Sequence, residues 1–250
     1  MCGRYRLSRP AQLVEYFEAE AEDDFRTSYN IAPTQPVAAV RADLLVDFLL
    51  DGRAGVQADV RPNHERRFLS NLRWGLVPSW AKDTSVGSQM INARSETILE
   101  KPSFRESFLE RRCLLPADGF YEWKRSGKLK RPFHFGMKDG SLFAFAGIWD
   151  RWKPLRGGVV ESCSILTTTP NQLLEDIHDR MPVILPQSAY EAWLTAPPEQ
   201  AEGLIEFLAP FDPARMRRYE VSSLVNSAAN DSPECAAEVA SPSENLTLWA

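Results

Sequence analysis

Residues 132–149, PFHFGMKDGSLFAFAGIW, determine the fold class of this chain. Residues 132–137 and 142–149 are rich in aromatic side chains, and the segment between them contains Asp and Gly. Aromatic or β-branched runs bounded by such turn residues are typical of β-strands. A third run of this kind follows at residues 163–168. The middle of the chain is therefore predicted to form a β-sheet.

Further strands are predicted on both sides of this region. Residues 37–40 and 44–50 flank a polar break and could pair with each other, and residues 72–77 end at a proline. Residues 51–67 are rich in Gly, Asp, Asn and Arg, which predicts a connecting loop. Residues 217–221 are the last predicted strand.

Five short segments are predicted to be helical, because apolar residues share one face or because a capping residue begins the segment. In the first segment the apolar face comprises Leu13, Val14 and Phe17. In the second, Ser103 and Glu106 form a capping box. The five segments are residues 10–18, 103–111, 171–177 (capped by Asn171), 188–194 and 198–208.

No internal repeat or linker divides the chain, which favours one α+β domain with a curved antiparallel sheet. From about residue 227 the sequence is rich in Ser, Asn, Ala and Pro. We predict a domain over residues 1–233 and a loosely ordered tail over residues 234–250.

Composition narrows the class of protein. The 250 residues are 44% hydrophobic and 25% charged, with a formal net charge of −5, which is the balance of a soluble globular protein. The acidic charge excludes a protein that coats nucleic acid by bulk charge. The first ten residues lack the apolar core of a signal peptide, and no apolar run is long enough to predict a membrane span. The four cysteines lack zinc spacing, which predicts reduced thiols and no metal.

Cys2 carries the most distinctive chemistry. An initiator methionine is usually removed when the next side chain is small, and removal of Met1 leaves Cys2 with an α-amine beside its thiol. The amine has an ordinary pKa of about 7.7–8.0, so part of it is nucleophilic at neutral pH. Nearby cations such as Arg4 and Arg6 would lower the pKa of the thiol. A 1,2-aminothiol condenses with an aldehyde to an imine and then closes a thiazolidine ring.

Seven blocks, in this order, resemble the SOS response-associated peptidase (SRAP) family. The resemblance runs from Cys2 to about Pro233 and implies a single domain with a barrel-like β core and peripheral helices. The blocks are MCGRY at the start and residues 30–35 (NIAPTQ), 73–81 (RWGLVPSWA), 91–98 (INARSETI), 113–124 (CLLPADGFYEWK), 145–149 (FAGIW) and 177–185 (IHDRMPVIL).

The resemblance implies roles for four catalytic residues. Cys2 would form the thiazolidine with the ring-opened aldehyde of an abasic site, and Asn92 would orient the thiol and contact the sugar. Glu122 would transfer a proton, and His178 would assist ring opening and crosslink reversal. The residues alone leave alternatives open: Glu122 on a solvated strand face, His178 as a structural histidine and Asn92 as a turn residue. His64 and His134 receive no role.

The same blocks imply a surface for single-stranded DNA. Arginines would bind phosphates, aromatic side chains beside a proline would stack on bases, and one asparagine would line the channel. Core packing is the alternative for the tryptophans. Met181 stands where some relatives carry a second arginine, so one phosphate contact is missing. The implied DNA-binding residues are Arg4, Asn30, Trp74, Pro78, Trp80, Arg94 and Arg180.

The leading hypothesis is a DNA-repair protein that captures abasic sites in single-stranded DNA and has lyase or crosslink-reversal activity. It requires no cofactor, acts as a monomer, and lies at the nucleoid in the cytoplasm if the source is bacterial. A cysteine peptidase that removes Met1, using Cys2, Glu122 and His178, is the first alternative. A non-covalent single-strand-binding module is the second.

Overall fold

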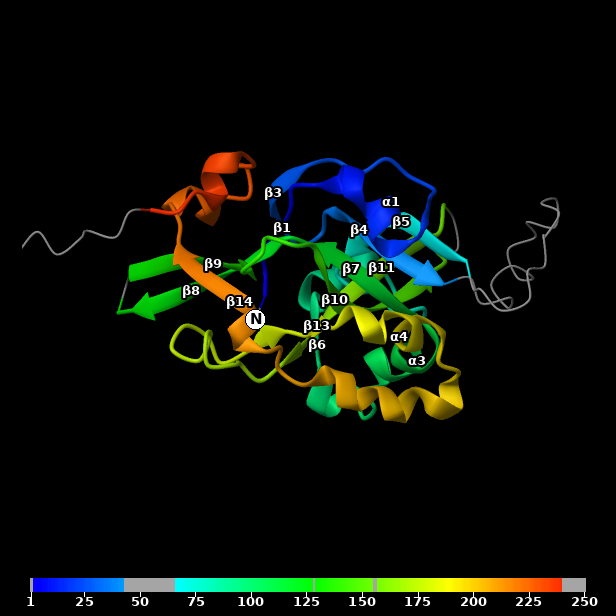
Figure 1. The fold of residues 1–250 in the computed structure, drawn as a ribbon. Helices are drawn as coiled ribbons and strands as arrows, with labels where there is room; N and C mark the ends of the chain where they lie inside the picture. Colours follow the sequence, from blue (N-terminus) through cyan, green and yellow to red (C-terminus); the bar gives the residue numbers. More distant parts are fainter. Residues whose placement is uncertain (1, 43–65, 128, 155–156, 240–250) are drawn as a thin grey trace, which may run out of the picture.

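Two β-sheets form the framework of the described part of the protein, one of five strands and one of nine (Figure 1). The computed structural model describes residues 2–42, 66–127, 129–154 and 157–239. The strands are β1 (Tyr5–Leu7), β2 (Glu20–Ala21), β3 (Ser28–Ile31), β4 (Pro36–Ala42), β5 (Arg67–Trp74), β6 (Asn92–Arg94), β7 (Arg112–Ala117), β8 (Gly119–Ser126), β9 (Leu129–Met137), β10 (Phe143–Trp152), β11 (Val160–Thr168), β12 (Met181–Pro182), β13 (Ile184–Leu185) and β14 (Met216–Glu220).

Short helices lie around the sheets, and many of them are single 3-10 turns. The α-helices of the described residues are α1 (Leu13–Phe17), α3 (Pro102–Glu110) and α4 (Tyr190–Thr195). The 3-10 segments are η1 (Pro10–Gln12), η2 (Thr84–Gln89), η3 (Ser95–Thr97), η4 (Gln187–Ala189), η5 (Pro198–Leu208), η6 (Pro213–Arg215), η7 (Ser223–Asn226) and η8 (Pro233–Ala236).

Five strands of the larger sheet close into a barrel. The strands β11, β10, β7, β4 and β5 are neighbours through antiparallel pairing. The ring closes because β5 returns to β11 through a short parallel pairing of Arg73 with Ser162 and Trp74 with Cys163. The predicted barrel-like core with peripheral helices is confirmed, and the parallel closing pair is an addition to it.

Strands β7 and β10 are buried along most of their length, because one face lies inside the barrel and helices α3 and α4 cover the other. Strands covered on both faces read as continuous apolar runs. Inside the barrel, Tyr5 packs edge-on against Trp74 and Phe145 at centroid distances of 5.4 and 5.7 Å. This packing ties β1 to the barrel.

Arg112, at the start of β7, joins the carboxyl ends of α3 and α4. Its Nε donates to the Trp193 carbonyl at 2.6 Å, and Nη1 donates to the carbonyls of Phe108 and Leu109 at 2.8 and 2.6 Å. Nη2 donates to the carbonyl of Ala196. Helix carboxyl ends carry partial negative charge and carbonyls without partners in the helix, so they stabilise this buried cation.

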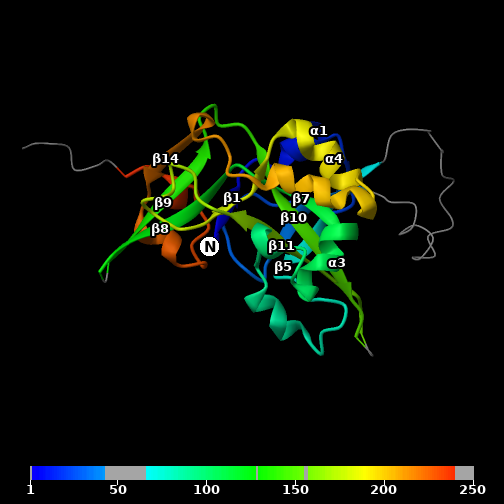
Figure 2. The same ribbon diagram turned by 90° about the horizontal axis from the view of Figure 1, so that it is seen from below.

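The smaller sheet has the strand order β14, β9, β8, β1, β3. Strand β1 pairs with β8 only through Tyr5 with Phe120 and Arg6 with Gly119. Strand β9 continues to pair with β8 as far as Ser126. Beyond β1, one edge of β8 therefore has no strand beside it in the described part of the chain. In Figures 1 and 2 the segment leading into β1 lies between this β8–β9 arm and the barrel.

A buried carboxylate anchors β1. Asp118 accepts hydrogen bonds from Arg6 Nε at 2.6 Å and from the backbone and hydroxyl of Ser8 at 2.8 and 2.6 Å. The Asp118 amide in turn donates to the Arg6 carbonyl. The position of Cys2, three residues before β1, follows from this anchor.

His134 on β9 is buried and stacks on Tyr219 at a centroid distance of 4.7 Å. Neither ring nitrogen has a hydrogen-bond partner within the described residues. A β-carbon at Gly119 would lie 2.0 Å from His134 Nε2, so the strand can pass the ring only with glycine at this position.

The helix predictions need three corrections. Residues 10–18 form η1 followed by α1, but Val14 faces solvent while Leu13 and Phe17 are buried. Helix α3 begins at Pro102 with Lys101 as its uncapped N-cap residue, so the predicted capping box is wrong. Pro is favoured at the first helical position because it lacks the N–H that would be unsatisfied there. Residues 171–177 form hydrogen-bonded turns, and the Asn171 side chain accepts from Leu173 N.

The remaining predicted helices are present with altered bounds or type. Residues 188–194 lie in η4 and α4, with Pro186 as the N-cap residue of η4. Residues 198–208 have the predicted bounds and are a 3-10 segment.

The strand predictions at 132–137, 142–149, 163–168, 37–40 and 217–221 fall on β9, β10, β11, β4 and β14. Strand β5 starts earlier than predicted and ends at Trp74, because Gly75 has a φ of 123° and leaves the sheet. The predicted strand at 44–50, and most of the predicted loop at 51–67, lie outside the described residues.

The segment after the predicted domain boundary continues to pack on the sheet. Cys235 and Ala236 are buried against Tyr121 and Val225. Val221 forms an isolated bridge with Glu238. The described residues 234–239 of the predicted tail are therefore packed, and the boundary at residue 233 stays a prediction.

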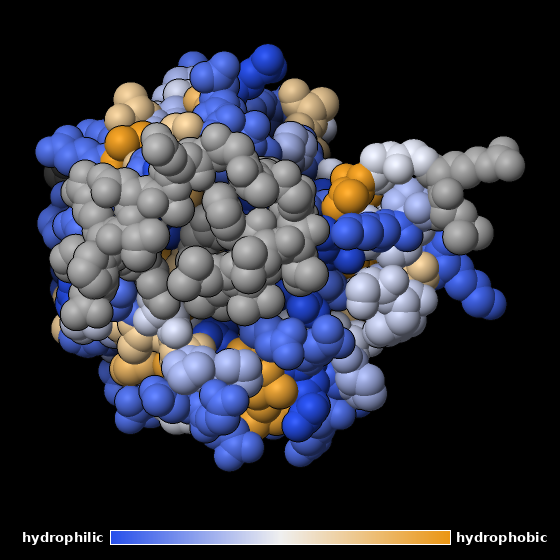
Figure 3. Space-filling view, turned by 90° about the vertical axis from the view of Figure 1, so that its right-hand side faces the viewer, coloured by the Kyte–Doolittle hydropathy of each residue, from blue (hydrophilic) through white to orange (hydrophobic). Residues whose placement is uncertain are grey.

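The surface on the side of the barrel away from the β8–β9 hairpin is mainly hydrophilic in its described parts, with small separate apolar patches (Figure 3). None of the helices in the described ranges has the length and apolarity that a membrane span requires.

Candidate active site

Cys2 is buried where β1 enters between the sheets. The residue is 0% exposed, and its thiol makes a long hydrogen bond of 3.7 Å to the Arg4 carbonyl. Asn92 Nδ2 donates to the Cys2 carbonyl at 2.9 Å. Asn92 begins β6, which pairs in parallel with β11 through Ile165. The barrel thus positions Cys2 through Asn92, whose Oδ1 is buried and has no hydrogen-bond partner within the described residues.

Glu122 on β8 is the acidic side chain whose charge acts on the Cys2 thiol. Its side chain is almost fully buried, and burial raises the pKa of Glu122 to about 7. Burial raises the pKa of the Cys2 thiol well above its usual range, and the negative charge of Glu122 adds to this effect. At neutral pH the Glu122 carboxyl is therefore present both as an acid and as a base, while the thiol keeps its proton.

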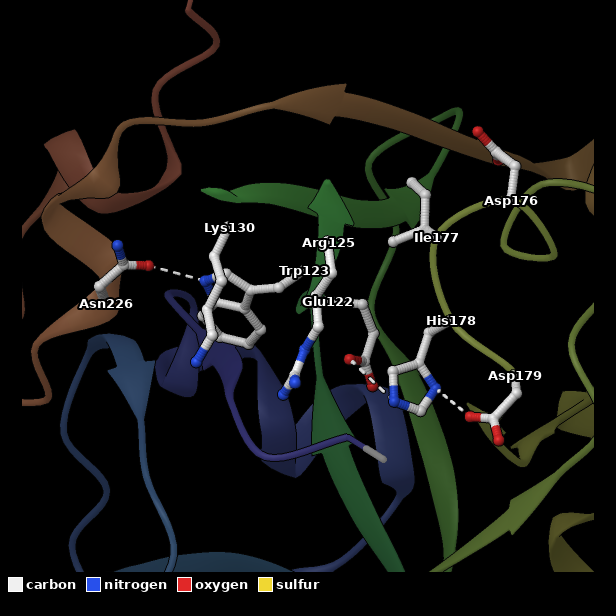
Figure 4. A pocket seen from close by; sticks show the side chains of 9 residues that line it. All are labelled: Glu122, Trp123, Arg125, Lys130, Asp176, Ile177, His178, Asp179 and Asn226. Atoms are coloured by element: carbon white, nitrogen blue, oxygen red, sulfur yellow. Dashed lines mark hydrogen bonds and ion pairs between the residues drawn. The ribbon is translucent and has the colours of Figure 1, made fainter. Parts of the chain in front are cut away.

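His178 follows the turns of residues 171–177 and points toward Glu122 (Figure 4). Its Nε2 lies 4.0 Å from Glu122 Oε2. The Arg180 amide donates to His178 Nδ1 at 3.0 Å, so the proton of the neutral ring is on Nε2 and faces Glu122. Asp179 Oδ1 also lies 2.9 Å from Nδ1. Burial lowers the pKa of His178, which favours the neutral ring and the amide as the partner of Nδ1.

A cavity of about 720 Å³ lies in front of these groups. Glu122 on one face of β8 and Trp123 and Arg125 on the other all contribute to its wall. Cys2, being fully buried, does not line it. The lining residues are Glu122, Trp123, Arg125, Lys130, Asp176, Ile177, His178, Asp179 and Asn226. Across the described ranges, no three side chains suited to metal coordination come together.

The structure uses Arg4 and Asn30 to hold the C-terminal segment. Arg4 Nη1 donates to Asn30 Oδ1 at 3.0 Å and to the Val225 carbonyl at 2.9 Å. Asn30 is 1% exposed, and its Nδ2 donates to the carbonyls of Ser227 and Asn230 at 2.9 and 2.7 Å. This burial argues against a direct DNA contact by Asn30.

The tryptophan block divides between core and surface. Trp74 is 0% exposed and donates from Nε1 to the Ile91 carbonyl at 2.9 Å, so it belongs to the core. Pro78 is buried. Trp80 is 62% exposed and is the member of this block available to a ligand.

The two further arginines differ in availability. Arg94 on β6 is exposed. Arg180 is held by Glu96 through Nη1 and Nη2 at 2.6 and 2.9 Å, and Nη2 also donates to the Thr167 carbonyl at 2.5 Å. Arg180 therefore positions the His178 loop, and it could bind a phosphate only if the Glu96 pair opened.

Seven of the nine lining residues received no role from the sequence, among them Trp123, Arg125 and Lys130. Trp123 Nε1 donates to Asn226 Oδ1 at 2.7 Å. Arg125 and Lys130 lie directly opposite each other in the β8–β9 pairing. In the sequence, the charged residues on both sides of Gly127, after the FYEWK block, are typical of a β-hairpin. The sequence does not show which residues of the two strands lie opposite each other.

The chain is similar in sequence and fold to known proteins. The model of the SOS response associated peptidase (SRAP) family matches residues 1–228. The abasic site processing protein YoqW of Bacillus subtilis is 43% identical over 239 residues, covering 94% of this chain and 98% of the relative. The abasic site processing protein HMCES of Gallus gallus is 32% identical, covering 86% of this chain and 67% of that protein. A crystal structure of a protein from Bacteroides thetaiotaomicron superposes with a TM-score of 0.78 at 27% identity, covering 95% of this chain and 100% of that chain.

Proposed function

The chain belongs to the SOS response associated peptidase (SRAP) family, and on that premise we propose that it processes abasic sites in single-stranded DNA by capturing them covalently through Cys2. Relatives that cover nearly the whole chain carry the name abasic site processing protein. The observation that carries the proposal is the set of buried Cys2, buried Glu122 and half-buried His178, with Asn92 holding the Cys2 carbonyl.

The first step requires the α-amine of Cys2, which hydrolysis of the bond from Met1 exposes. An abasic sugar is a closed hemiacetal, and its opening breaks the C1′–O4′ bond. The Glu122 carboxylate takes the proton of the 1′-hydroxyl, while the protonated form of His178 gives its Nε2 proton to O4′ and returns to the neutral ring. The products are a C1′ aldehyde and a protonated Glu122, which is ready to act as an acid.

The aldehyde then condenses with Cys2. The α-amine adds to C1′, and Glu122 gives its proton to the departing hydroxyl, so water leaves and an iminium ion remains. The Cys2 sulfur adds to the iminium carbon, the thiol proton returns to Glu122, and the nitrogen regains its electron pair. The net change is aldehyde plus aminothiol to thiazolidine plus one water. A carboxyl with a pKa of about 7 suits both proton transfers at neutral pH.

The same iminium ion explains a lyase activity. Loss of a C2′ proton to a base allows the 3′-phosphate to leave by β-elimination, which cleaves the strand. Addition of the Cys2 sulfur consumes the iminium ion and competes with this loss. A variant that keeps the α-amine and lacks the thiol should therefore cleave more of the DNA than wild type and hold less of it in a covalent adduct.

The geometry argues against a general cysteine peptidase. Such enzymes use a thiolate formed by a lowered thiol pKa beside a base. The Cys2 thiol is buried, and burial raises its pKa. A thiol in this state is better suited to an activated iminium carbon than to an amide. Cleavage of unrelated peptides that is lost with Cys2→Ala would favour the peptidase instead.

The test is a denaturing gel of the mature protein with a single-stranded oligonucleotide that carries one abasic site. Wild type should give a covalent band that survives denaturation. Cys2→Ser keeps the small side chain and the α-amine, so it should give a borohydride-trappable imine and strand cleavage without the stable band.

An intact strand and a form with an N-terminal extension are the controls, and neither should form the band. If wild type, shown by mass to lack Met1, gave no covalent band, capture through Cys2 would be rejected. Equal binding of intact and abasic strands, unchanged by Cys2→Ser, would then favour the non-covalent binding module.

A further inference from the structure

The β8–β9 hairpin extends beyond the catalytic groups and carries two cations on the wall of the same cavity. Arg125 and Lys130 are both exposed, and both line the cavity that contains Glu122 and His178 (Figure 4). They are directly opposite residues of the antiparallel pair. The side chains of opposite residues lie about 4.5–5.5 Å apart at Cβ and project from the same face.

This arrangement is unfavourable for the hairpin by itself. Like charges directly opposite destabilise an antiparallel pair, whereas opposite charges stabilise it by roughly 0.2–1 kcal/mol. Within the described residues, neither the Arg125 nor the Lys130 side chain forms an ion pair or a side-chain hydrogen bond, whereas their neighbours Lys124 and Arg131 do. The carboxylates on the same cavity wall are engaged elsewhere: Asp176 with Lys124 and Arg218, and Glu122 and Asp179 on either side of His178.

Three neighbouring cations each have a carboxylate partner. Lys124 pairs with Asp176 at 2.6 Å. Arg218 also pairs with Asp176, and Arg131 pairs with Glu220. Hydrogen bonds from Arg218 and Lys124 lower the pKa of the Asp176 carboxyl to about 2, so its negative charge is already paired with these two cations. Arg125 and Lys130 therefore stand out from their neighbours in a chain whose net charge is −5.

We propose that Arg125 and Lys130 form a phosphate clamp for the DNA strand that flanks the captured sugar. The proposal rests on the proposed function, and it identifies where the strand leaves the site: along the uncovered edge of β8 toward the hairpin turn. A guanidinium binds two phosphate oxygens at once, and an ammonium supplies a point charge beside it. A phosphodiester between the two side chains would supply the counterion that the hairpin lacks.

The first measurement is the salt dependence of binding to a single strand with an intact sugar, which separates the clamp from the covalent chemistry. The variants are Arg125→Gln, Lys130→Gln and the double variant. The matched control is Lys124→Gln, a lysine of the same hairpin that is paired with Asp176 and does not line the cavity.

Each neutralised phosphate contributes about −0.7 to the slope of log K against log salt on a single strand. Because the clamp holds one phosphodiester, the double variant should lower the steepness by about 0.7 and weaken binding about tenfold at low salt. The control should keep the wild-type slope. A double variant with unchanged slope and affinity would overturn the clamp.

The second measurement locates the phosphate. Single methylphosphonate groups, which are neutral, are placed in turn on each side of the lesion. One or two positions on one side should weaken wild type, and the same positions should have no further effect on the double variant, as in a double-mutant cycle. Equal additive losses at every position would overturn the clamp.

The two proposals fail separately. At saturating protein, the double variant should still form the covalent band at the wild-type extent, because it retains Cys2, Glu122 and His178. If wild type forms no band while the salt slopes differ as expected, the covalent function fails and the clamp stands. If the band forms while the slopes are equal, the clamp fails alone.

Discussion

Polar groups in two regions of the molecule are treated in contrasting ways. Arg112 is surrounded by the carbonyls of two helix ends, and its donors are used in hydrogen bonds. In the candidate site, Glu122 on β8 has a pKa near neutrality, and Asn92 Oδ1, at the start of β6, accepts no hydrogen bond in the described chain. The first arrangement stabilises the fold, and the second leaves groups available to a ligand.

The difference teaches which buried polar groups to regard as functional. A buried polar group without partners costs about 1–3 kcal/mol, so a fold retains it only where something else compensates. Arg112 needs no ligand. Asn92 Oδ1 gains a partner only when a ligand reaches it, and Glu122, whose pKa is near neutrality, can exchange a proton with that ligand. Variants at the two places should therefore separate stability from activity.

The largest effect is expected for Glu122→Gln. Loss of the proton transfer should slow adduct formation by about 10²–10⁴-fold, the usual contribution of a general acid–base residue. Quenched time courses on denaturing gels measure this rate. A rate within about threefold of wild type would contradict a proton-transfer role for Glu122.

The same variant should be more stable than wild type at high pH. The pKa of Glu122 is raised from about 4.3 in the unfolded chain to about 7 in the fold. Its protonation therefore favours the fold below about pH 4.3, and this contribution is lost as the pH rises through 7. At pH 8 the buried carboxylate costs about 4 kcal/mol of stability, which Gln avoids. Urea unfolding at pH 5 and pH 8 should show the gain mainly at pH 8.

Arg112→Met should have the opposite profile. It leaves the carbonyls at the ends of α3 and α4 without donors, which should lower the free energy of unfolding by about 3 kcal/mol or more. The rate of adduct formation per folded molecule should stay at the wild-type value. Arg112→Lys is the matched variant and should recover part of the stability. A large change in rate at full folding would place Arg112 in the activity and break the comparison.

Asn92→Ala should have a moderate effect. It removes the hydrogen bond to the Cys2 carbonyl, a bond of the kind that contributes about 0.5–1.5 kcal/mol. Adduct formation should slow about tenfold, and stability should change little, because the orphaned Oδ1 is removed with the same substitution. Single-turnover rates and urea unfolding at one pH measure the two quantities. A loss of stability without a loss of rate would assign Asn92 to the fold.

His134→Phe tests whether a buried polar group without partners always belongs to the site. His134 is buried without hydrogen-bond partners in the described chain, yet it does not line the cavity. Burial lowers the pKa of His134 well below its usual value, so its neutral form favours the fold above about pH 6.5. Below that pH, wild type should lose up to about 1.4 kcal/mol per pH unit relative to the variant. Adduct formation at neutral pH should be unchanged, and a slower rate would mean that His134 also serves the site.

The strands that sequence reasoning found are those with continuous apolar runs. Strands β9 and β10 could be predicted because both have long buried stretches. The closing pair of β5 with β11 could not, because it joins Trp74 to Cys163, and a short parallel contact leaves no local pattern. The start of α3 was misplaced by one residue because Pro102 supplies the signal and Ser103 mimics it.

The predicted site residues also fall into two groups, those that could be identified from residue type and those that could not. Cys2, Asn92, Glu122 and His178 have chemistry that depends on residue type, and the fold brings them together. The DNA-binding residues depend on burial and on partners, which residue type does not reveal. Burial removes Asn30 and Trp74 from the surface and Glu96 occupies Arg180, whereas Arg125 and Lys130 are available.

The full burial of Cys2 has a consequence for the order of events during synthesis. The residue is made second, but its surroundings come from Asn92, Glu122 and His178. At about 5–20 residues per second, a ribosome adds His178 roughly 9–35 s after Cys2. During that interval the amino end emerges as an extended nascent chain that a processing enzyme can reach. Once the fold is complete Cys2 is fully buried, so this interval is when the amino end is most open to processing.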